Sequence, residues 1–152
     1  MPKEFILLLH NIRNRFNVGA IFRTADAAGI SKIYLCGITP APPHHKIDKV
    51  ALGAEKYLPF EKYKQTARLI HELKSKGFYI IALEQSKKSI PYYKFKPKSP
   101  LALVIGSEVK GLPQKLLKLC HQIVEIPMHG KRESLNVAVA SGIVCFEIIK
   151  NK

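Results

Sequence analysis

The chain has 152 residues, of which 47% are hydrophobic, and this suits one compact domain with a real core. It carries 25 Lys and Arg residues against 11 Asp and Glu residues, which gives a net charge of +14. Such an excess on a small domain favours a polyanionic partner, either nucleic acid or an anionic membrane, over an ordinary solvated surface. The membrane is the weaker alternative, because no apolar run reaches the ~20 residues of a spanning helix.

The N-terminal segment and the cysteines favour a cytoplasmic protein. Phe5–Leu9 is too short for the apolar region of a secretory signal, and Glu4 precedes it. Cys36, Cys120 and Cys145 are odd in number and widely spaced, which favours reduced thiols over a disulfide framework. No histidine pair has zinc-ligand spacing with a cysteine, so we expect no metal site.

Apolar runs alternate with helical patterns, which predicts an α/β domain with a mostly parallel sheet and flanking helices. The expected strands are Phe5–Leu9, Lys32–Cys36, Phe78–Leu83, Leu101–Ile105 and Gln122–Ile126. The expected helices are Val18–Ala28, Thr66–Lys76, a short one near Pro113–Leu119, and Asn136–Ile149. The proline-rich segment Thr39–His45 is expected to be a loop. Because no repeat or linker interrupts the pattern, we expect a single domain over residues 1–152.

Two of these helices have surfaces that a monomer does not require. Opposite its apolar stripe, Val18–Ala28 carries small residues around one arginine: Gly19, Ala20, Arg23 and Ala27. A solvated face would carry Lys, Glu or Gln, so this face suits close approach by another chain or segment. The last helix is apolar nearly all round, which is typical of burial on several sides. We therefore expect a homodimer with both helices at or near the interface; the alternative is a last helix buried in a crowded core.

Glycine and small polar residues are concentrated where regular elements are expected to begin or end. The three segments are Asn17–Arg23, Ile105–Leu112, and Ile126–Met128 followed by Ser134–Asn136. At such places in α/β domains, backbone groups are free to hold a ligand. The second segment lacks both the Lys-Ser/Thr of a phosphate-binding loop and the Gly-x-Gly of a dinucleotide site. Taken alone, it could equally be a tight strand–helix turn.

Local structural roles would also explain several of these residues. Asn17 can cap the helix that starts at Val18, and Ser134 or Asn136 can cap the last helix. A ligand is favoured by the combination of features in the third segment. The apolar Ile126–Met128 suits adenine, and free N–H groups beside a serine and an asparagine can hold polar substituents.

In this order, the three segments resemble the three signature motifs of the SpoU/TrmH branch of the SPOUT RNA methyltransferases. The resemblance covers nearly the whole chain and implies a deep C-terminal trefoil knot. It also implies that S-adenosylmethionine donates a methyl group to a ribose 2′-hydroxyl in structured RNA, with tRNA somewhat favoured over rRNA. The donor would lie near Leu83, Gly106, Ile126, Met128 and Leu135.

The resemblance also implies a set of catalytic residues, namely Arg23, Asn17, Glu108, Ser134 and Asn136. In the family, the matching arginine assists attack by the ribose hydroxyl. Neutralising an arginine of pKa about 12.5 at pH 7 costs roughly 7 kcal/mol, at about 1.36 kcal/mol per pKa unit. We therefore prefer Arg23 as a phosphate clamp that stabilises the developing alkoxide, with deprotonation left open. Glu108 supports the site by the same resemblance, or else pairs structurally with a Lys or Arg.

Basic residues suggest where RNA could bind. Those flanking the motifs are expected to meet the target nucleotide: Arg13, Arg15, Lys131 and Arg132. A further run without acidic residues interleaves lysines with aromatics: Lys87, Lys88, Tyr92, Tyr93, Lys94, Phe95, Lys96 and Lys98. That run suits phosphates and stacked bases, or a lysine-protected sheet edge. The alternative function is a catalytically silent RNA-binding protein of the same fold, and a metabolite-binding protein would leave the charge unexplained.

Overall fold

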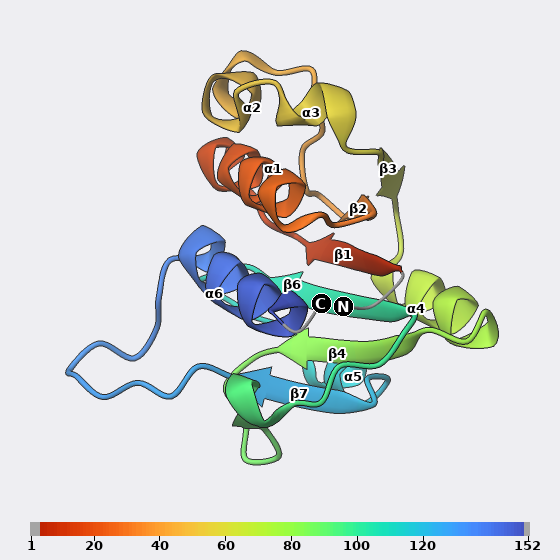
Figure 1. Ribbon diagram of the computed structural model, residues 1–152, viewed down its shortest axis with the longest axis vertical. Helices are drawn as coiled ribbons and strands as arrows, with labels where there is room; N and C mark the ends of the chain where they lie inside the picture. Colours follow the sequence, from red (N-terminus) through yellow and green to blue (C-terminus); the bar gives the residue numbers. More distant parts are fainter. Residues whose placement is uncertain (1–3, 151–152) are drawn as a thin grey trace.

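The computed structural model describes residues 4–150 and contains a seven-stranded sheet in which every paired neighbour is parallel (Figure 1). The strand order across the sheet is β3-β2-β1-β6-β4-β7-β5. The strands are β1 (Phe5–His10), β2 (Lys32–Cys36), β3 (Phe60–Tyr63), β4 (Tyr79–Leu83), β5 (Ile90–Pro91), β6 (Leu101–Gly106) and β7 (Gln122–Glu125). The predicted α/β class with a parallel sheet is confirmed.

Helices cover both faces of this sheet. They are α1 (Arg15–Ala28), α2 (His45–Ala51), α3 (Ala54–Tyr57), α4 (Thr66–Ser75), α5 (Gln114–Leu117) and α6 (Val137–Ile149), with a 3-10 turn η1 at Tyr92–Lys94. The helices α1, α2, α3 and α6 share one core with the sheet, and α4 and α5 share the other. Every predicted element is present, with ends shifted by three residues or fewer.

Alternate residues of β1 enter different cores, which explains why this strand is a continuous apolar run. Phe5, Leu7 and Leu9 pack in the core beside α1 and α6, whereas Ile6 and Leu8 pack in the core beside α4. All five are at most 2% exposed. A parallel strand covered on both faces needs apolar side chains at every position.

Four elements were not predicted from the sequence, namely α2, α3, β3 and β5. These elements are short and mostly exposed: α2 buries only Ile47 and Ala51, and β5 has two residues. Such segments carry too few core positions to show a periodic pattern. The strands β3 and β5 are also the two edges of the sheet, where burial is least.

The helix α2 accounts for part of the small-residue face of α1. A Cβ atom on Gly19 would lie 2.4 Å from the carbonyl oxygen of Ile47, so only glycine permits this approach. Of the two predicted alternatives, another chain or another segment, Gly19 meets the second, because α2 of the same chain lies against it. Ala20 is half-buried, and Arg23 and Ala27 remain exposed on the same helix.

The carboxyl ends of the central strands lie level with one another and position the site. In the register of the sheet, His10 of β1 pairs with Gly106 of β6, and Leu83 of β4 pairs with both Ile105 and Val124. The loops that follow β1, β4, β6 and β7 therefore all start at the edge of the sheet that is formed by the carboxyl ends of the strands. Ligands of open α/β sheets bind at this edge.

Candidate active site

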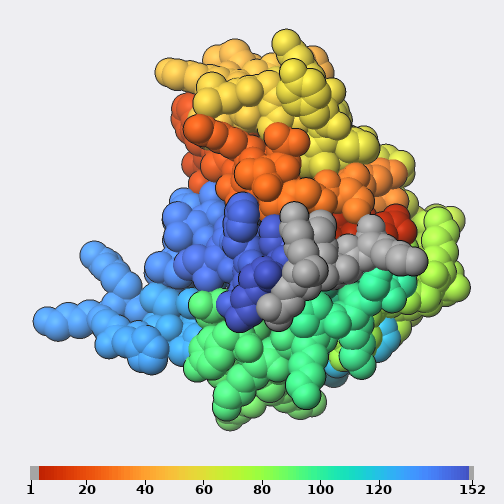
Figure 2. Space-filling model, in the orientation of Figure 1, coloured from red at the N-terminus to blue at the C-terminus, as the bar shows by residue number. Residues whose placement is uncertain are grey.

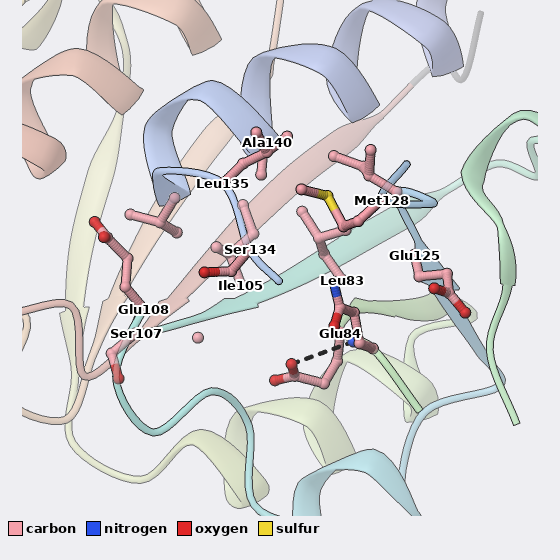
Figure 3. Close-up of a pocket in the computed structure, with 14 residues that line it drawn as sticks. Leu83, Glu84, Ile105, Ser107, Glu108, Glu125, Met128, Ser134, Leu135 and Ala140 are labelled. Atoms are coloured by element: carbon pink, nitrogen blue, oxygen red, sulfur yellow. Dashed lines mark hydrogen bonds between the residues drawn. The ribbon is translucent and has the colours of Figure 1, made fainter. Parts of the chain in front are cut away.

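The five residues predicted to surround the donor line a single pocket at this edge (Figure 3). Leu83 ends β4 and Gly106 ends β6, while Ile126 and Met128 follow β7 and Leu135 precedes α6. The structure thus brings together residues that are far apart in the sequence. Leu83, Ile126 and Met128 are each half-buried, so the pocket has an apolar wall that is open to a ligand.

Gly106 is required because the loop after β6 folds back over it. A Cβ atom there would lie 2.7 Å from the carbonyl carbon and 2.8 Å from the carbonyl oxygen of Gly111. The turn is closed by the Gly111 amide, which donates to the Ser107 carbonyl at 2.8 Å, and by the Lys110 amide, which donates to Ser107 Oγ at 3.2 Å. Gly111 itself has a φ of 61°. The second segment is therefore a fixed turn, which we call the Ser107–Gly111 turn.

Glu84 holds this turn in place, and the sequence analysis missed it. Its Oε2 accepts a hydrogen bond from the Leu112 amide at 2.7 Å, and its Oε1 accepts one from the Gln85 amide at 3.2 Å. Gln85 in turn donates from Nε2 to the Glu133 carbonyl at 2.7 Å, which links β4 to the loop before α6. The only signal in the sequence was the position of Glu84 directly after an apolar strand.

Asn17, Glu108 and Asn136 form a hydrogen-bonded triangle beside the pocket. Asn17 Nδ2 donates to Glu108 Oε1 at 2.7 Å, and Asn136 Nδ2 donates to Asn17 Oδ1 at 3.1 Å. Asn136 Nδ2 also lies 3.4 Å from Glu108 Oε1. One residue from each of the three predicted segments therefore contributes to the same cluster, and Glu108 pairs with amides rather than with a Lys or Arg.

The capping prediction is wrong for Asn17 and correct for Asn136. The helix α1 starts at Arg15, and Asn14 is its N-cap, accepting from the Asn17 amide at 3.0 Å. This leaves the Asn17 side chain free to reach the triangle. Asn136 caps α6 through Oδ1, which accepts from the next helical amides, while Ser134 lines the pocket instead.

A second cavity adjoins the pocket and shares Ser107, Glu108 and Val137 with it. Its other side is lined by the loop after β1, which includes Arg13, and by Asn17 of α1. A ligand in this cavity would therefore lie across the triangle from a ligand in the pocket. We call it the second cavity.

Residues 4–146 match the SpoU rRNA Methylase family. This chain belongs to that family. Among its relatives are the tRNA (guanosine(18)-2′-O)-methyltransferase of Aquifex aeolicus, 33% identical over 95% of this chain and 68% of its own length. Another is the 23S rRNA (guanosine-2′-O-)-methyltransferase RlmB of Vibrio parahaemolyticus, 33% identical over 97% of this chain and 59% of its own length.

Solved SpoU structures have the same fold. The AdoMet-bound rRNA methyltransferase from Sinorhizobium meliloti superposes with a TM-score of 0.92 at 31% identity, over 99% of this chain and 57% of that one. A structure described as showing 2-OH methylation of C/U34 on tRNA superposes with a TM-score of 0.85 at 25% identity, over 97% of this chain and 95% of that one. This chain thus spans between 57% and 68% of the length of the first three of these relatives and 95% of the last.

Within this SpoU chain, Arg23 lies apart from the other predicted catalytic residues. It is exposed and lines neither the pocket nor the second cavity. Six residues of α-helix separate it from Asn17, which is about 9 Å along the axis and about two thirds of a full rotation around it. The two side chains therefore point in different directions.

The predicted RNA contacts divide in the same way. Arg13 lines the second cavity, whereas Arg15, Lys131 and Arg132 are exposed but line none of these cavities. Lys131 and Arg132 lie on the loop before α6, which projects from the body of the molecule (Figure 1). The structure leaves these three contacts as predictions.

Within the basic and aromatic run, the segment of residues 92–98 next to β5 behaves mostly as a protected edge. Tyr92 and Phe95 pack against the core, and Lys98 lies 4.6 Å from the centre of the Tyr79 ring. Only Tyr93 of the three aromatics is largely exposed. Little stacking surface therefore remains for bases.

The cysteines are free thiols, as predicted, and burial raises the pKa of Cys36 and Cys145 to about 12. Burial also lowers the pKa of His10, which lines the second cavity and shares a hydrogen bond of 2.7 Å with Thr66. Residues 4–150 contain no group of three metal-ligating side chains, and no helix within that range could cross a membrane.

Proposed function

We propose that this chain transfers a methyl group from S-adenosylmethionine to the 2′-hydroxyl of a ribose in RNA. The observation that carries the proposal is the meeting of all three segments at one pocket, with the Asn17, Glu108 and Asn136 triangle on the side that opens to the second cavity. The pocket would hold the donor, and the second cavity would hold the target nucleotide. The free thiols accord with a cytoplasmic location.

The lining of the pocket suits this donor. S-adenosylmethionine supplies its methyl group as an electrophile on a positively charged sulfur, next to an adenine ring. Leu83, Ile126 and Met128 offer apolar surface for the ring, and Glu84 and Glu125 place carboxylates nearby for the positive charge. The chain must then hold the ribose oxygen in line with the methyl carbon and the sulfur, because alignment supplies most of the rate gain in such a displacement.

Both tRNA and rRNA are supported as substrates by the relatives. The A. aeolicus relative is named for tRNA and the V. parahaemolyticus relative for 23S rRNA. The structure matched over 95% of its own length concerns C/U34 of tRNA. Because this chain covers 95% of that protein, we propose tRNA as the favoured substrate.

We further propose that the active form is a homodimer built on the outer face of α1 and α6. Phe16 is 46% exposed on α1, and Val139 and Phe146 are 53% and 46% exposed on α6. Phe16 and Arg23 are seven residues apart, so they share one face of α1. The two helices lie next to each other on the surface (Figure 2). Burying exposed apolar side chains on a second copy would stabilise the dimer by about 25 cal/mol per Å² of apolar area.

The dimer would also give Arg23 a site. Val137 and Ala140 of α6 line the donor pocket, whereas Val139 of the same helix faces outward. A partner docked on that outer surface would bring its own Arg23 close to this pocket. We propose that Arg23 clamps the target phosphate in the partner's site and stabilises the developing alkoxide.

The C-terminal trefoil knot stays a prediction from the family resemblance.

The proposed activity is tested by incubating the protein with isotope-labelled S-adenosylmethionine and bulk tRNA or rRNA. The expected product is a nucleoside that carries the label on the ribose, identified by mass spectrometry after digestion. Calorimetry gives a second readout, since a catalytically silent RNA-binding protein would bind RNA without binding the donor. Label on a base, or no label with any RNA and no donor binding, would contradict the proposal. Met128→Arg, which places a cation in the donor pocket, is the matched negative control.

A further inference from the structure

A third cavity extends from the Ser107–Gly111 turn along α5 towards β7. It shares Glu84 and Glu108 with the donor pocket, and it shares the turn with the second cavity. Four exposed lysines line it: Lys87, Lys88, Lys110 and Lys118. We call this cavity the basic groove. Because it shares residues with both the donor pocket and the second cavity, the basic groove is continuous with the place where donor and target would meet.

The positive charge of the basic groove is only partly offset within the described chain, since four lysines line it against the two carboxylates of Glu84 and Glu108. The ion pairs found within residues 4–150 involve other lysines and arginines. The carboxylates of the groove have other partners, since Glu84 accepts from two backbone amides and Glu108 accepts from Asn17. Burial and the charge of Lys74 lower the pKa of His121, another lining residue, so this imidazole adds little to the positive charge of the lysines. Four lysines thus face one groove without carboxylate partners.

The lysines are held there by separate, ordered segments. Lys87 and Lys88 lie in a turn after β4, where the Lys88 amide donates to Ser86 Oγ at 3.2 Å. Lys110 belongs to the Ser107–Gly111 turn, and Lys118 is the C-cap of α5. Charges that converge from several fixed segments repel one another, and an anion in the groove would relieve this repulsion.

We propose that the basic groove holds the RNA strand next to the target nucleotide, with Lys87, Lys88, Lys110 and Lys118 contacting successive phosphates. This proposal rests on the proposed function, which places the target nucleotide in the second cavity. RNA binding in the basic groove should not depend on the identity of the bases, because lysines that contact phosphates fix the register of an RNA without reading its sequence. The edge segment near β5 is a poorer candidate, since Lys98 and two of its aromatics are engaged within the chain.

The test compares two variants with equal loss of charge. The groove variant combines Lys87→Gln, Lys88→Gln and Lys118→Gln. The control variant combines Lys49→Gln, Lys56→Gln and Lys76→Gln, which are exposed lysines on α2, on α3 and after α4, outside the groove. Binding of fluorescent oligouridylate and of bulk tRNA is measured across about 50 to 200 mM salt, where phosphate contacts dominate the salt dependence. Donor affinity, by calorimetry, reports whether each variant keeps its fold.

The groove variant should lose about 2 units of slope in log K against log salt for oligouridylate, since each lost phosphate contact removes about 0.7. Its affinity for tRNA should fall at least tenfold more than that of the control variant, with donor affinity unchanged in both. Equal losses in the two variants would overturn the proposal, because charge alone would then explain the binding. An unchanged groove variant would overturn it too. If the wild type methylates no RNA but the groove variant still loses its slope, the groove stands and the proposed activity fails.

Discussion

Two subunits that are inactivated by different substitutions should recover methyl transfer when they form a heterodimer. In the proposed dimer, each donor pocket works with the Arg23 of the partner subunit. We therefore expect a heterodimer of Arg23→Ala with Met128→Arg to be active, although each homodimer is inactive. The Arg23→Ala subunit keeps its pocket and receives an intact arginine from its partner. Because one of the two sites is then complete, the activity per dimer should be about half that of the wild type.

The two substitutions act on different steps. Met128 lines the donor pocket, so an arginine there sets a positive charge against the sulfonium of the donor. At about 4 Å this repulsion costs about 1 to 4 kcal/mol, between the dielectric of water and that of a protein surface. Arg23 is exposed and lies off the core, so its truncation opens no cavity and leaves donor binding intact.

The assay uses two affinity tags and sequential purification, so that only heterodimers are measured. A heterodimer of wild type with Met128→Arg is the control, and it should also reach about half the wild-type activity. Calorimetry should find one donor molecule per heterodimer in both preparations. An inactive Arg23→Ala and Met128→Arg heterodimer beside an active control would rule out a site shared between subunits, because Arg23 would then act within its own subunit. A monomeric active wild type in light scattering would refute the dimer itself.

Three other predictions concern stability and reactivity. Gly106→Ala should lower the free energy of unfolding, measured in urea, by about 1 to 3 kcal/mol, because the added Cβ would lie 2.7 Å from the backbone of Gly111. Gly130→Ala is the control and should leave the free energy of unfolding unchanged, because a Cβ there has open space; equal effects of the two substitutions would contradict this packing. Asn14→Ala should cost about 1 kcal/mol as a lost cap. Asn17→Ala should cost less stability but slow methyl transfer, and the reverse order would assign the cap to Asn17. Since burial raises the pKa of Cys145 to about 12, its thiol should resist Ellman's reagent at pH 8 until urea is added. Rapid labelling of Cys145 itself in the folded chain, as distinct from the partly buried Cys120, would contradict its burial.

The central strands were predictable because strands that are buried on both faces are continuous apolar runs in the sequence. Leu101–Ile105 is apolar at every position and is fully buried in the structure, and the same holds for Phe5–Leu9. The meeting of the three segments was predicted from the family resemblance, and the pocket lining agrees with it. In a parallel sheet, glycine and polar residues after such strands gather at one edge, so their positions in the sequence carry spatial information.

The remaining features depend on contacts that no local pattern encodes. Glu84 supports the Ser107–Gly111 turn through an amide 28 residues away, and an isolated glutamate after a strand gives no sign of that partner. The close neighbour of Gly19 stayed open between another chain and another segment, because Ile47 lies on a short helix without a clear period. For Asn17 the alternative role of a cap fails, because α1 starts three residues earlier than predicted and leaves the Asn17 side chain to the triangle.

The Ser107–Gly111 turn couples the three ligands that the proposed reaction requires. Ser107 and Glu108 line the donor pocket, the second cavity and the basic groove. Main-chain hydrogen bonds close the turn, and Glu84 and the tight fit at Gly106 fix it to the sheet. Methyl transfer demands that oxygen, carbon and sulfur stay aligned to within a fraction of an ångström, and a shared rigid turn removes independent motion between donor and target. An RNA strand held in the basic groove would then be positioned by the same element that positions the methyl group.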